Sequence, residues 1–414
     1  MKKFCLLIAA ILFTGGCVFN FMPPWMSELE KLSLKYGNGN VDYDISSWSF
    51  QTVATYNNLE VYPYQVKFQV DSQGRPHLAY KADSDLLIKY FNGSWTEYAQ
   101  DNPDFSGIGF YEFDFVLDKT DRALVTFTIE EYVGPDWIYY LNFSYNNGAS
   151  NNVWETDTLW NSEQNIYDST VRIGQNNTPY LVGRDNDKIY LWTNPESNPS
   201  PKDFETTDYY PSLQTAVIDG NNNMYLLNPD YWDGDNSSIA LFKINLNDET
   251  PGINLQTTIE KEGGGTGEKG IYISLRGNNP YVSFIDEIWD GTNDYQKISI
   301  SSPLSADSGI EQFDEIDFEW IYDFALSFNS KGNAFLFIVD NVWVEDGGEY
   351  YCYGHLHTRY YSDADGWIPL NGIQYSATIE RISVVMHNDM PYICVLLYDN
   401  TADNYNIKIL KFAP

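Results

Sequence analysis

The sequence is poor in cysteine, histidine and positive charge. Its 414 residues include four cysteines and four histidines, and 24 lysines and arginines accompany 58 aspartates and glutamates, giving a formal net charge of −34. Nucleic-acid binding needs basic side chains that replace counterions on phosphates, so this charge argues against a nucleic-acid partner. It also argues against direct adsorption to an anionic membrane surface. What the acidity favours is solubility, together with attraction for cations or basic partners.

Compact catalytic motifs are also absent. The chain has no G-x-S-x-G, no H-E-x-x-H and no phosphate-binding glycine loop. We therefore predict no catalytic residues. Paired carboxylates could still act as the acid and base of a glycosidase. A carbohydrate-active enzyme, either a glycosidase or a polysaccharide lyase, accordingly remains the alternative to a binding protein.

Long apolar runs are missing, and the N-terminal one is too short to span a membrane. Lys2 and Lys3 precede the apolar core 5–13, and Thr14-Gly15-Gly16 leads directly to Cys17. This ending resembles the lipobox of bacterial lipoproteins. The resemblance implies that residues 1–16 are a signal peptide and that Cys17 is acylated, which would anchor the protein to a lipid bilayer of the cell envelope on the extracytoplasmic side. Thr14 stands where the lipobox usually has leucine, so a simple secretory signal is the alternative.

Residues 17–46 are interpreted as a tether. The capping box Ser27-Glu28-Leu29-Glu30 predicts a short helix that ends near Gly37. Removal of the signal peptide discards Cys5 and leaves Cys352 and Cys394 as the unmodified cysteines. Our strand assignment places these two on neighbouring sheets, which stack about 10 Å apart, whereas a disulfide needs Cα atoms within about 7 Å. We expect two buried free thiols.

Aromatic residues, by contrast, are abundant. They make up 16% of the chain, with 33 tyrosines, 23 phenylalanines and 12 tryptophans. Such side chains suit a pleated, half-buried surface, so the composition favours β-strands.

From residue 47 to 414 one phrase recurs: an apolar strand, a turn rich in Asp, Asn and Gly, and a second apolar strand. It occurs seven times, with a period of about 52 residues, which is typical of a β-propeller with four strands per blade. The residues that open the second strands are Pro76, Ala123, Pro179, Met224, Pro280, Ala334 and Pro391. The fold class is therefore all-β, a seven-bladed propeller over residues 47–414. Because nothing after residue 412 can supply a last outer strand, we predict that residues 48–54 pair with 407–412 and close the ring.

The first repeat, Asp71-SQGRPHLAY, resembles a D-x-x-G-x-P-H-x-x-Y repeat of secreted microbial proteins with sialidase-like propellers that lack Asp-boxes. The resemblance implies the fold and no activity. Sialidases themselves have Asp-boxes, S-x-D-x-G-x-x-W, and the nearest match here, Ser362 to Trp367, has the wrong spacing. We therefore do not expect a sialidase.

The connections between second and third strands share one face of a propeller, and here they are more than twice as rich in Asp and Glu as the whole chain. We predict these loops at residues 81–85, 129–136, 183–187, 228–238, 286–294, 340–349 and 399–404. Three of them contain a tryptophan at a similar offset, and Tyr132 occupies the same offset in the second repeat. Aromatic rings beside carboxylates suggest a platform for a sugar or an anchor for a protein partner. A covering role, in which each tryptophan folds over its own blade, is the alternative. The predicted ligand-binding residues are Trp232, Trp289, Trp343, Asp233, Asp286, Asp290, Asp340 and Glu345. Only Lys81 and Arg184 oppose these acids, which argues against a lyase acting on an acidic polysaccharide.

No cofactor and no metal ligand are predicted. Asp230, Asp233, Asp235 and Asn236 could offer oxygen ligands to Ca²⁺, without the spacing of a known calcium loop. His355 and His357 alternate along a strand and so lie on one side of it. Two imidazoles at that spacing can share a metal, but the sequence identifies no third ligand.

Overall fold

The computed structural model describes residues 49–57, 66–82, 85–97, 110–146, 153–162, 168–185, 187–205, 212–233, 236–248, 251–260, 270–289, 294–302, 304, 311–312, 321–346, 349–399, 401–402 and 404–411. All of them belong to the compact unit Tyr43–Pro414. The predicted signal peptide, Cys17 and the tether helix lie outside the described residues. Among those described, no helix has the length and apolar character needed to cross a membrane.

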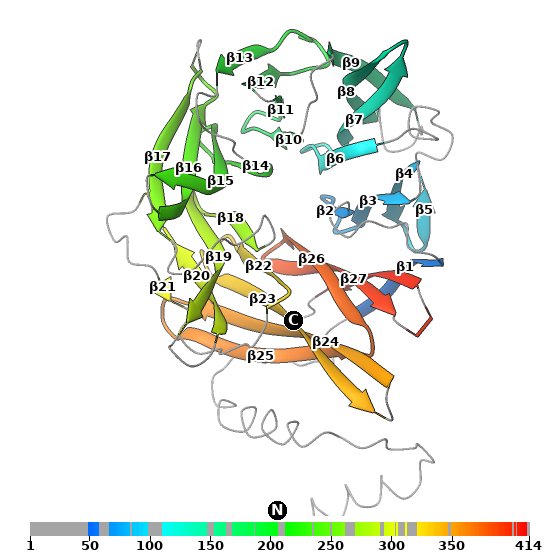
Figure 1. Ribbon diagram of the computed structural model, residues 1–414, viewed down its shortest axis with the longest axis vertical. Helices are drawn as coiled ribbons and strands as arrows, with labels where there is room; N and C mark the ends of the chain where they lie inside the picture. Colours follow the sequence, from blue (N-terminus) through cyan, green and yellow to red (C-terminus); the bar gives the residue numbers. More distant parts are fainter. Residues whose placement is uncertain are drawn as a thin grey trace, which may run out of the picture. The chain divides into compact units, whose positions relative to one another are not determined.

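The described residues form seven antiparallel sheets of four strands and contain no helix. The sheets are arranged in a ring as the blades of a seven-bladed β-propeller, which confirms the predicted fold class (Figure 1). From inner to outer strand, blades one to three consist of β2 (Val66–Val70), β3 (Pro76–Ala82), β4 (Asp85–Phe91) and β5 (Trp95–Glu97); β6 (Phe110–Leu117), β7 (Ala123–Val133), β8 (Asp136–Asn146) and β9 (Trp154–Ser162); and β10 (Asp168–Ile173), β11 (Pro179–Arg184), β12 (Lys188–Thr193) and β13 (Lys202–Glu205).

Blades four to seven have the same organisation. From inner to outer strand they consist of β14 (Ser212–Ile218), β15 (Asn223–Asp233), β16 (Asn236–Asn245) and β17 (Ile253–Glu260); β18 (Ile271–Arg276), β19 (Asn279–Trp289), β20 (Asp294–Ser301) and β21 (Glu311–Gln312); β22 (Asp323–Phe328), β23 (Ala334–Asp346), β24 (Glu349–Ser362) and β25 (Gly366–Tyr375); and β26 (Thr378–His387), β27 (Met390–Asp399), β28 (Asn404–Lys411) and β1 (Ser49–Asn57).

Blade seven is closed by the N-terminal strand, as the sequence predicts. β1 runs antiparallel to β28 along its whole length, from the pair Ser49–Lys411 to the pair Asn57–Asn404. The two ends of the propeller sequence therefore share one sheet. Without β1, strand β28 would be an edge with unpaired N–H and C=O groups.

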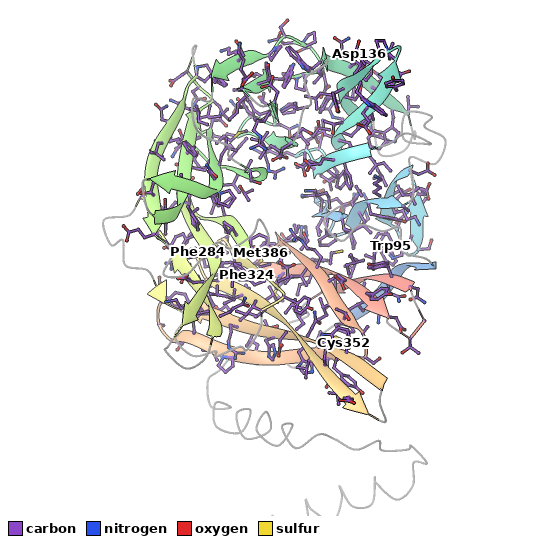
Figure 2. The ribbon with its side chains drawn as sticks, viewed as in Figure 1. Trp95, Asp136, Phe284, Phe324, Cys352 and Met386 are labelled. Atoms are coloured by element: carbon purple, nitrogen blue, oxygen red, sulfur yellow. The ribbon has the colours of Figure 1, made fainter. Side chains whose placement is uncertain are left out.

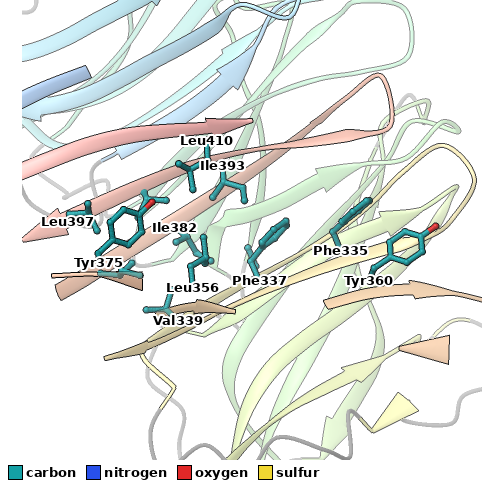
Figure 3. Packing of buried hydrophobic residues seen from close by; sticks show 13 residues of the cluster. Phe335, Phe337, Val339, Leu356, Tyr360, Tyr375, Ile382, Ile393, Leu397 and Leu410 are labelled. Carbon is teal, nitrogen blue, oxygen red and sulfur yellow. The ribbon is translucent and has the colours of Figure 1, made fainter. Parts of the chain in front are cut away.

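Seven hydrophobic clusters lie between neighbouring blades, and the alternation of side chains along each strand produces them. On β23, Phe335, Phe337 and Val339 pack against blade seven. Leu336 and Ile338, between them in sequence, pack against blade five. Figure 3 shows the contact of blades six and seven. Side chains fill the spaces between sheets around the ring, with Phe284 and Phe324 as labelled examples (Figure 2).

The repeated Asp or Asn that follows the first strand holds the turn to the second. In blade one the Oδ1 atom of Asp71 accepts hydrogen bonds from the backbone N–H groups of Gln73 and Arg75, at 2.9 and 2.8 Å. Equivalent pairs of bonds are made by Asp118, Asp219 and Asn329. The Asp or Asn of the repeated phrase therefore stabilises the turn between the first and second strands.

The same turns are also joined from blade to blade. Each carries a residue in the left-handed region, such as Asp121 (φ 64°), Asn177 (φ 59°) and Asn222 (φ 59°). The side chains of these three residues accept a backbone N–H from the preceding blade, from Ser72, Lys119 and Gln175 respectively, at 2.7 Å. Gly220 with Asn278 and Ser330 with Asp389 make the corresponding bonds of later blades. These five bonds form a belt around one end of the propeller, which we call the turn belt.

Both described cysteines are free and buried, as predicted. Cys352 lies on β24 of blade six and Cys394 on β27 of blade seven. Burial raises the pKa of both thiols.

Candidate functional site

The end of the propeller opposite the turn belt carries extended β-hairpins where the sequence suggested loops. In blades two, four, five and six the second and third strands continue outward as a pair, as from Val339–Leu356 to Asp346–Glu349 in blade six. In blade four the register shifts between Asn228 and Tyr231. The predicted loops 129–136, 228–238, 286–294 and 340–349 are therefore largely strand. The physical reason is that alternating aromatic and β-branched residues, as in Val342-Trp343-Val344, keep the strand pattern despite the neighbouring acids.

Exposed aromatic rings lie near the tips of two of these hairpins. Tyr132 on β7 and Trp137 on β8 are cross-strand partners, 59% and 49% exposed. Their ring centroids lie 5.1 Å apart. Trp343 on β23 is 50% exposed, and Val344 and Glu345 beside it are exposed as well. In Figure 2, Asp136 marks the tip of the first hairpin, and Cys352, the cross-strand partner of Trp343, marks the second. We call Tyr132, Trp137 and Trp343 the hairpin aromatics.

Carboxylates accompany the rings. Glu131 and Asp136 flank the Tyr132–Trp137 pair and are exposed. The Tyr140 hydroxyl, which donates to Glu131, has its pKa raised by desolvation and by the charge and hydrogen bond of that carboxylate. The blade-two tip thus places hydrogen-bond acceptors next to an apolar ring surface.

The predicted ligand residues fall into three groups. Trp343, Asp340 and Glu345 lie together on the blade-six hairpin, with Asp340 partly buried. Asp286 on β19 is 2% exposed, so its carboxylate does not belong to the open surface. Trp232 and Asp233 end β15 and Trp289 ends β19, but their side chains lie outside what the structure describes, as does Asp290 altogether.

Trp137 is the aromatic that the sequence analysis missed. The sequence could have indicated it, because Trp137 follows the Gly134-Pro135 turn and pairs with Tyr132 on the other strand. The interpretation of residues 129–136 as a loop excluded this pairing.

A second group of charged side chains lies on the inner strands. Asp114 on β6 binds Arg172 on β10, accepts the Thr170 hydroxyl at 2.6 Å and has Lys67 at 3.7 Å. Burial raises the pKa of Asp114, and the charges of Arg172 and Lys67 reverse this effect and hold the pKa below its usual value. The cluster ties the inner strands of blades one, two and three together.

Asp168, the first residue of β10, has a different environment. Its Oδ2 accepts the backbone N–H of Leu213 in blade four at 2.6 Å. Burial raises its pKa to about 6, against the opposing effects of Arg184, the Leu213 amide, Lys67 and a hydrogen bond with Glu112. Asp168 and Glu112 therefore form a hydrogen-bonded carboxyl pair.

Asp323, the first residue of β22, makes the same kind of inter-blade contact. It accepts the Tyr272 hydroxyl from blade five and the Ile382 backbone N–H, at 2.9 Å, from blade seven. Burial raises its pKa, opposed by Arg381. Both aspartates join blades, which is an architectural role.

Three further features could hold a ligand. Among the described residues, Asp340, His355 and His357 are close enough together to bind a metal ion. Of the proposed calcium ligands, Asp233 and Asn236 are cross-strand partners at the blade-four tip, while Asp235 lies outside the described residues. At the opposite end of the propeller, a hollow of about 400 Å³ lies between the turns of blades six and seven, lined by Asn329, Ser330 and Asp389 among others.

No protein-family model matches the sequence, and no curated protein matches it either. Solved propellers do match in structure. The polysaccharide lyase Uly1 gives a TM-score of 0.51 at 10% identity, over 91% of this chain and 94% of that one. The NanB sialidase from Streptococcus pneumoniae gives a TM-score of 0.43 at 10% identity, over 88% of this chain and 70% of that one. The SapL1 lectin in complex with alpha methyl fucoside gives 0.40 at 10% identity, over 77% of this chain and 97% of that one. The likeness is one of fold, a β-propeller, and these structures include lyase, sialidase and lectin propellers.

Proposed function

We propose that this propeller is a non-catalytic glycan-binding protein that contacts its ligand with the hairpin aromatics. The observation that carries the proposal is the exposed ring surface of the hairpin aromatics, which lie at two separate positions on the ring: Tyr132 and Trp137 on blade two, and Trp343 on blade six. We further propose that acylated Cys17 tethers the protein outside the cytoplasmic membrane, so that this surface meets extracytoplasmic glycans.

The chemistry of the hairpin tips suits a sugar. An aromatic ring has an apolar face that packs against the C–H face of a pyranose, and carboxylates beside it accept hydroxyl protons. Aromatic rings held by β-strands lose little conformational freedom on binding, because the backbone is already ordered. The tilted Tyr132–Trp137 pair supplies a surface broader than one ring.

The charge of the protein restricts the class of glycan. With a net charge of −34, the protein repels sulfated or uronic acid polymers at long range. Neutral glycans and those with free amino groups are the expected ligands. Free amines would in addition pair with the carboxylates at the tips, such as Glu131 and Asp136.

The enzymatic alternative gains no support from the described carboxyl pair. Asp168 has the raised pKa expected of a general acid, but it is 5% exposed and one of its oxygens is occupied by the Leu213 amide. A group in that position joins blades and does not meet a polysaccharide. The structure of Uly1 indicates the fold and is not a ground for lyase activity here.

A glycan array combined with a turnover assay on the same ligands tests the proposal. The expected result is saturable binding to neutral or amino-bearing glycans with no release of reducing ends or unsaturated products. Turnover of any bound glycan would contradict a non-catalytic role. Saturable binding to a protein, with an empty array, would replace the glycan by a protein partner.

Anchoring is tested separately. The chain expressed with its own N-terminus in a bacterium should incorporate labelled palmitate and sediment with membranes. The Cys17→Ser variant should do neither. Labelling that persists in this variant would remove Cys17 as the site of acylation.

A further inference from the structure

Blade six brings two histidines and an aspartate together on one side of the β23–β24 hairpin. Asp340 is the cross-strand partner of His355, and His357 lies two residues further along β24 on the same face. The two imidazole rings are 5.9 Å apart and nearly perpendicular. Nε2 of His357 lies 4.0 Å from Oδ2 of Asp340. One ligand atom from each residue falls within 4.8 Å of the others.

This face of the hairpin is turned toward blade five, because Ile338 and Tyr361 on the same side pack against that blade. The cluster lies one step beyond Ile338 along the hairpin. The side chains of His357 and Asp340 are 22% and 23% exposed. His355 is buried, so solvent reaches the cluster from the side of His357 and Asp340.

The donor set identifies the class of ligand. Two imidazole nitrogens and one carboxylate oxygen match the three protein ligands of open zinc sites, whose fourth position holds water or a substrate oxygen. Calcium and magnesium prefer sets made of oxygen alone, so they are not the expected ions. Ligands of a tetrahedral zinc ion are about 3.4 Å apart, so the three side chains must rotate toward one another to bind the ion.

The charged groups beside the cluster act in opposite directions on a dication. Asp340 attracts the ion, whereas Arg359, two residues beyond His357 on the same face of β24, opposes it.

We infer that Asp340, His355 and His357 form a binding site for one Zn²⁺ ion, with a fourth coordination position open to water or to an oxygen of a bound ligand. The inference is independent of the glycan-binding proposal, because it stands on different residues.

The test uses the full chain without an affinity tag, freed of metals by a chelator. Zinc titrated in a calorimeter should bind at one ion per chain. His355→Gln, His357→Gln and Asp340→Asn should each weaken binding by about tenfold or more. His387→Gln removes a histidine outside the cluster and should leave the affinity unchanged.

A second measurement does not depend on variants. During a zinc titration the histidine ring resonances of the unaltered protein should shift for His355 and His357 and stay fixed for His77 and His387. Cobalt in place of zinc should give the visible absorption of a four-coordinate site. The inference is overturned by an absence of saturable binding, by shifts confined to His77 or His387, or by folded cluster variants that bind zinc as well as the parent.

Discussion

The pKa of a buried aspartate in this propeller depends on two opposing effects. Hydrogen bonds to the carboxylate lower the pKa, and burial away from water raises it. For Asp71 in the first turn, burial raises the pKa, but hydrogen bonds from His77 and from the Arg75 amide and guanidinium prevail and lower it. For Asp168 the burial effect prevails. The two side chains therefore contribute to stability with opposite dependence on pH.

The Asp168→Asn variant tests this difference. The folded-state pKa of about 6 lies above the ordinary value of 3.8, so the protonated side chain stabilises the fold fully below pH 4. This contribution is lost as pH rises through 6. Relative to the variant, the parent should lose roughly 1–3 kcal/mol of unfolding free energy between pH 4 and pH 8. Urea unfolding of both proteins across this range measures the difference.

Asparagine keeps an oxygen for the Leu213 amide, so the variant should remain folded. Parallel stability curves for the two proteins would show that Asp168 does not titrate in this range. A parent that gains stability over the variant as pH rises would reverse the sign and refute the assignment.

Residue pairs of this kind were beyond sequence reasoning. Asp114 and Arg172 are 58 positions apart, and nothing in either local sequence indicates the pairing. Asp340 escaped notice as a partner of His355 and His357 because the link depends on the register of one hairpin. The free thiols were predictable, since the repeat period alone placed Cys352 and Cys394 on different blades.

At the scale of elements, one residue in the turn between the first and second strands has two roles. It adopts the left-handed conformation that the turn needs, and its side chain bonds the preceding blade. Asn177 adopts a left-handed conformation, which suits asparagine or glycine, and its Oδ1 accepts the Lys119 N–H of the preceding blade at 2.7 Å. In blades one and six glycines occupy the equivalent left-handed position, as Gly74 and Gly332, and have no side chain to offer. An inter-blade bond of the turn belt therefore forms where the left-handed position holds Asn or Asp, and a glycine at that position cannot make it.

Two substitutions of Asn177 separate these contributions. Asn177→Gly keeps the backbone conformation and removes the inter-blade bond, so it should cost about 0.5–1.5 kcal/mol. Asn177→Ala removes the same bond but keeps a Cβ at positive φ, without the polar side chain that lets asparagine tolerate this region, so it should cost roughly 1 kcal/mol more than the glycine variant. Chemical denaturation of the three proteins gives both differences. Equal stability of the parent and the glycine variant would show that the belt contributes nothing.

The hairpins show where pattern reading at this scale fails. The strand–turn phrase predicted the four strands of each blade because their alternation is strong. The tips were assigned to loops because acids and glycines are turn formers, as in the segment from Asp340 to Glu349. The alternation of aromatic and β-branched residues, as in Val342-Trp343-Val344, favoured strand there, and pairing across the hairpin stabilised it.

For the whole molecule, ring closure depends on a single strand from the far end of the sequence. A chain that begins after residue 57 lacks β1, which leaves β28 as an exposed edge and blade seven with three strands. We expect this truncation to lose roughly 3 kcal/mol or more of stability and to self-associate. A chain that begins at residue 47 is the matched control and should remain monomeric and stable. Thermal unfolding and size-exclusion chromatography compare the two, and equal behaviour would contradict the closure.

The central claim is that the hairpin aromatics bind a glycan, and the affinity of their variants tests it most directly. Tyr132→Ala, Trp137→Ala, Trp343→Ala and the triple variant are compared by calorimetry on a glycan identified by the array. Leu255→Ala, an exposed apolar residue on the outer strand of blade four, is the control. Loss of a stacking ring should cost about 1–3 kcal/mol of binding free energy, some fivefold to a hundredfold in Kd, with unfolding unchanged. Binding by the triple variant as tight as by the Leu255→Ala control would contradict the account.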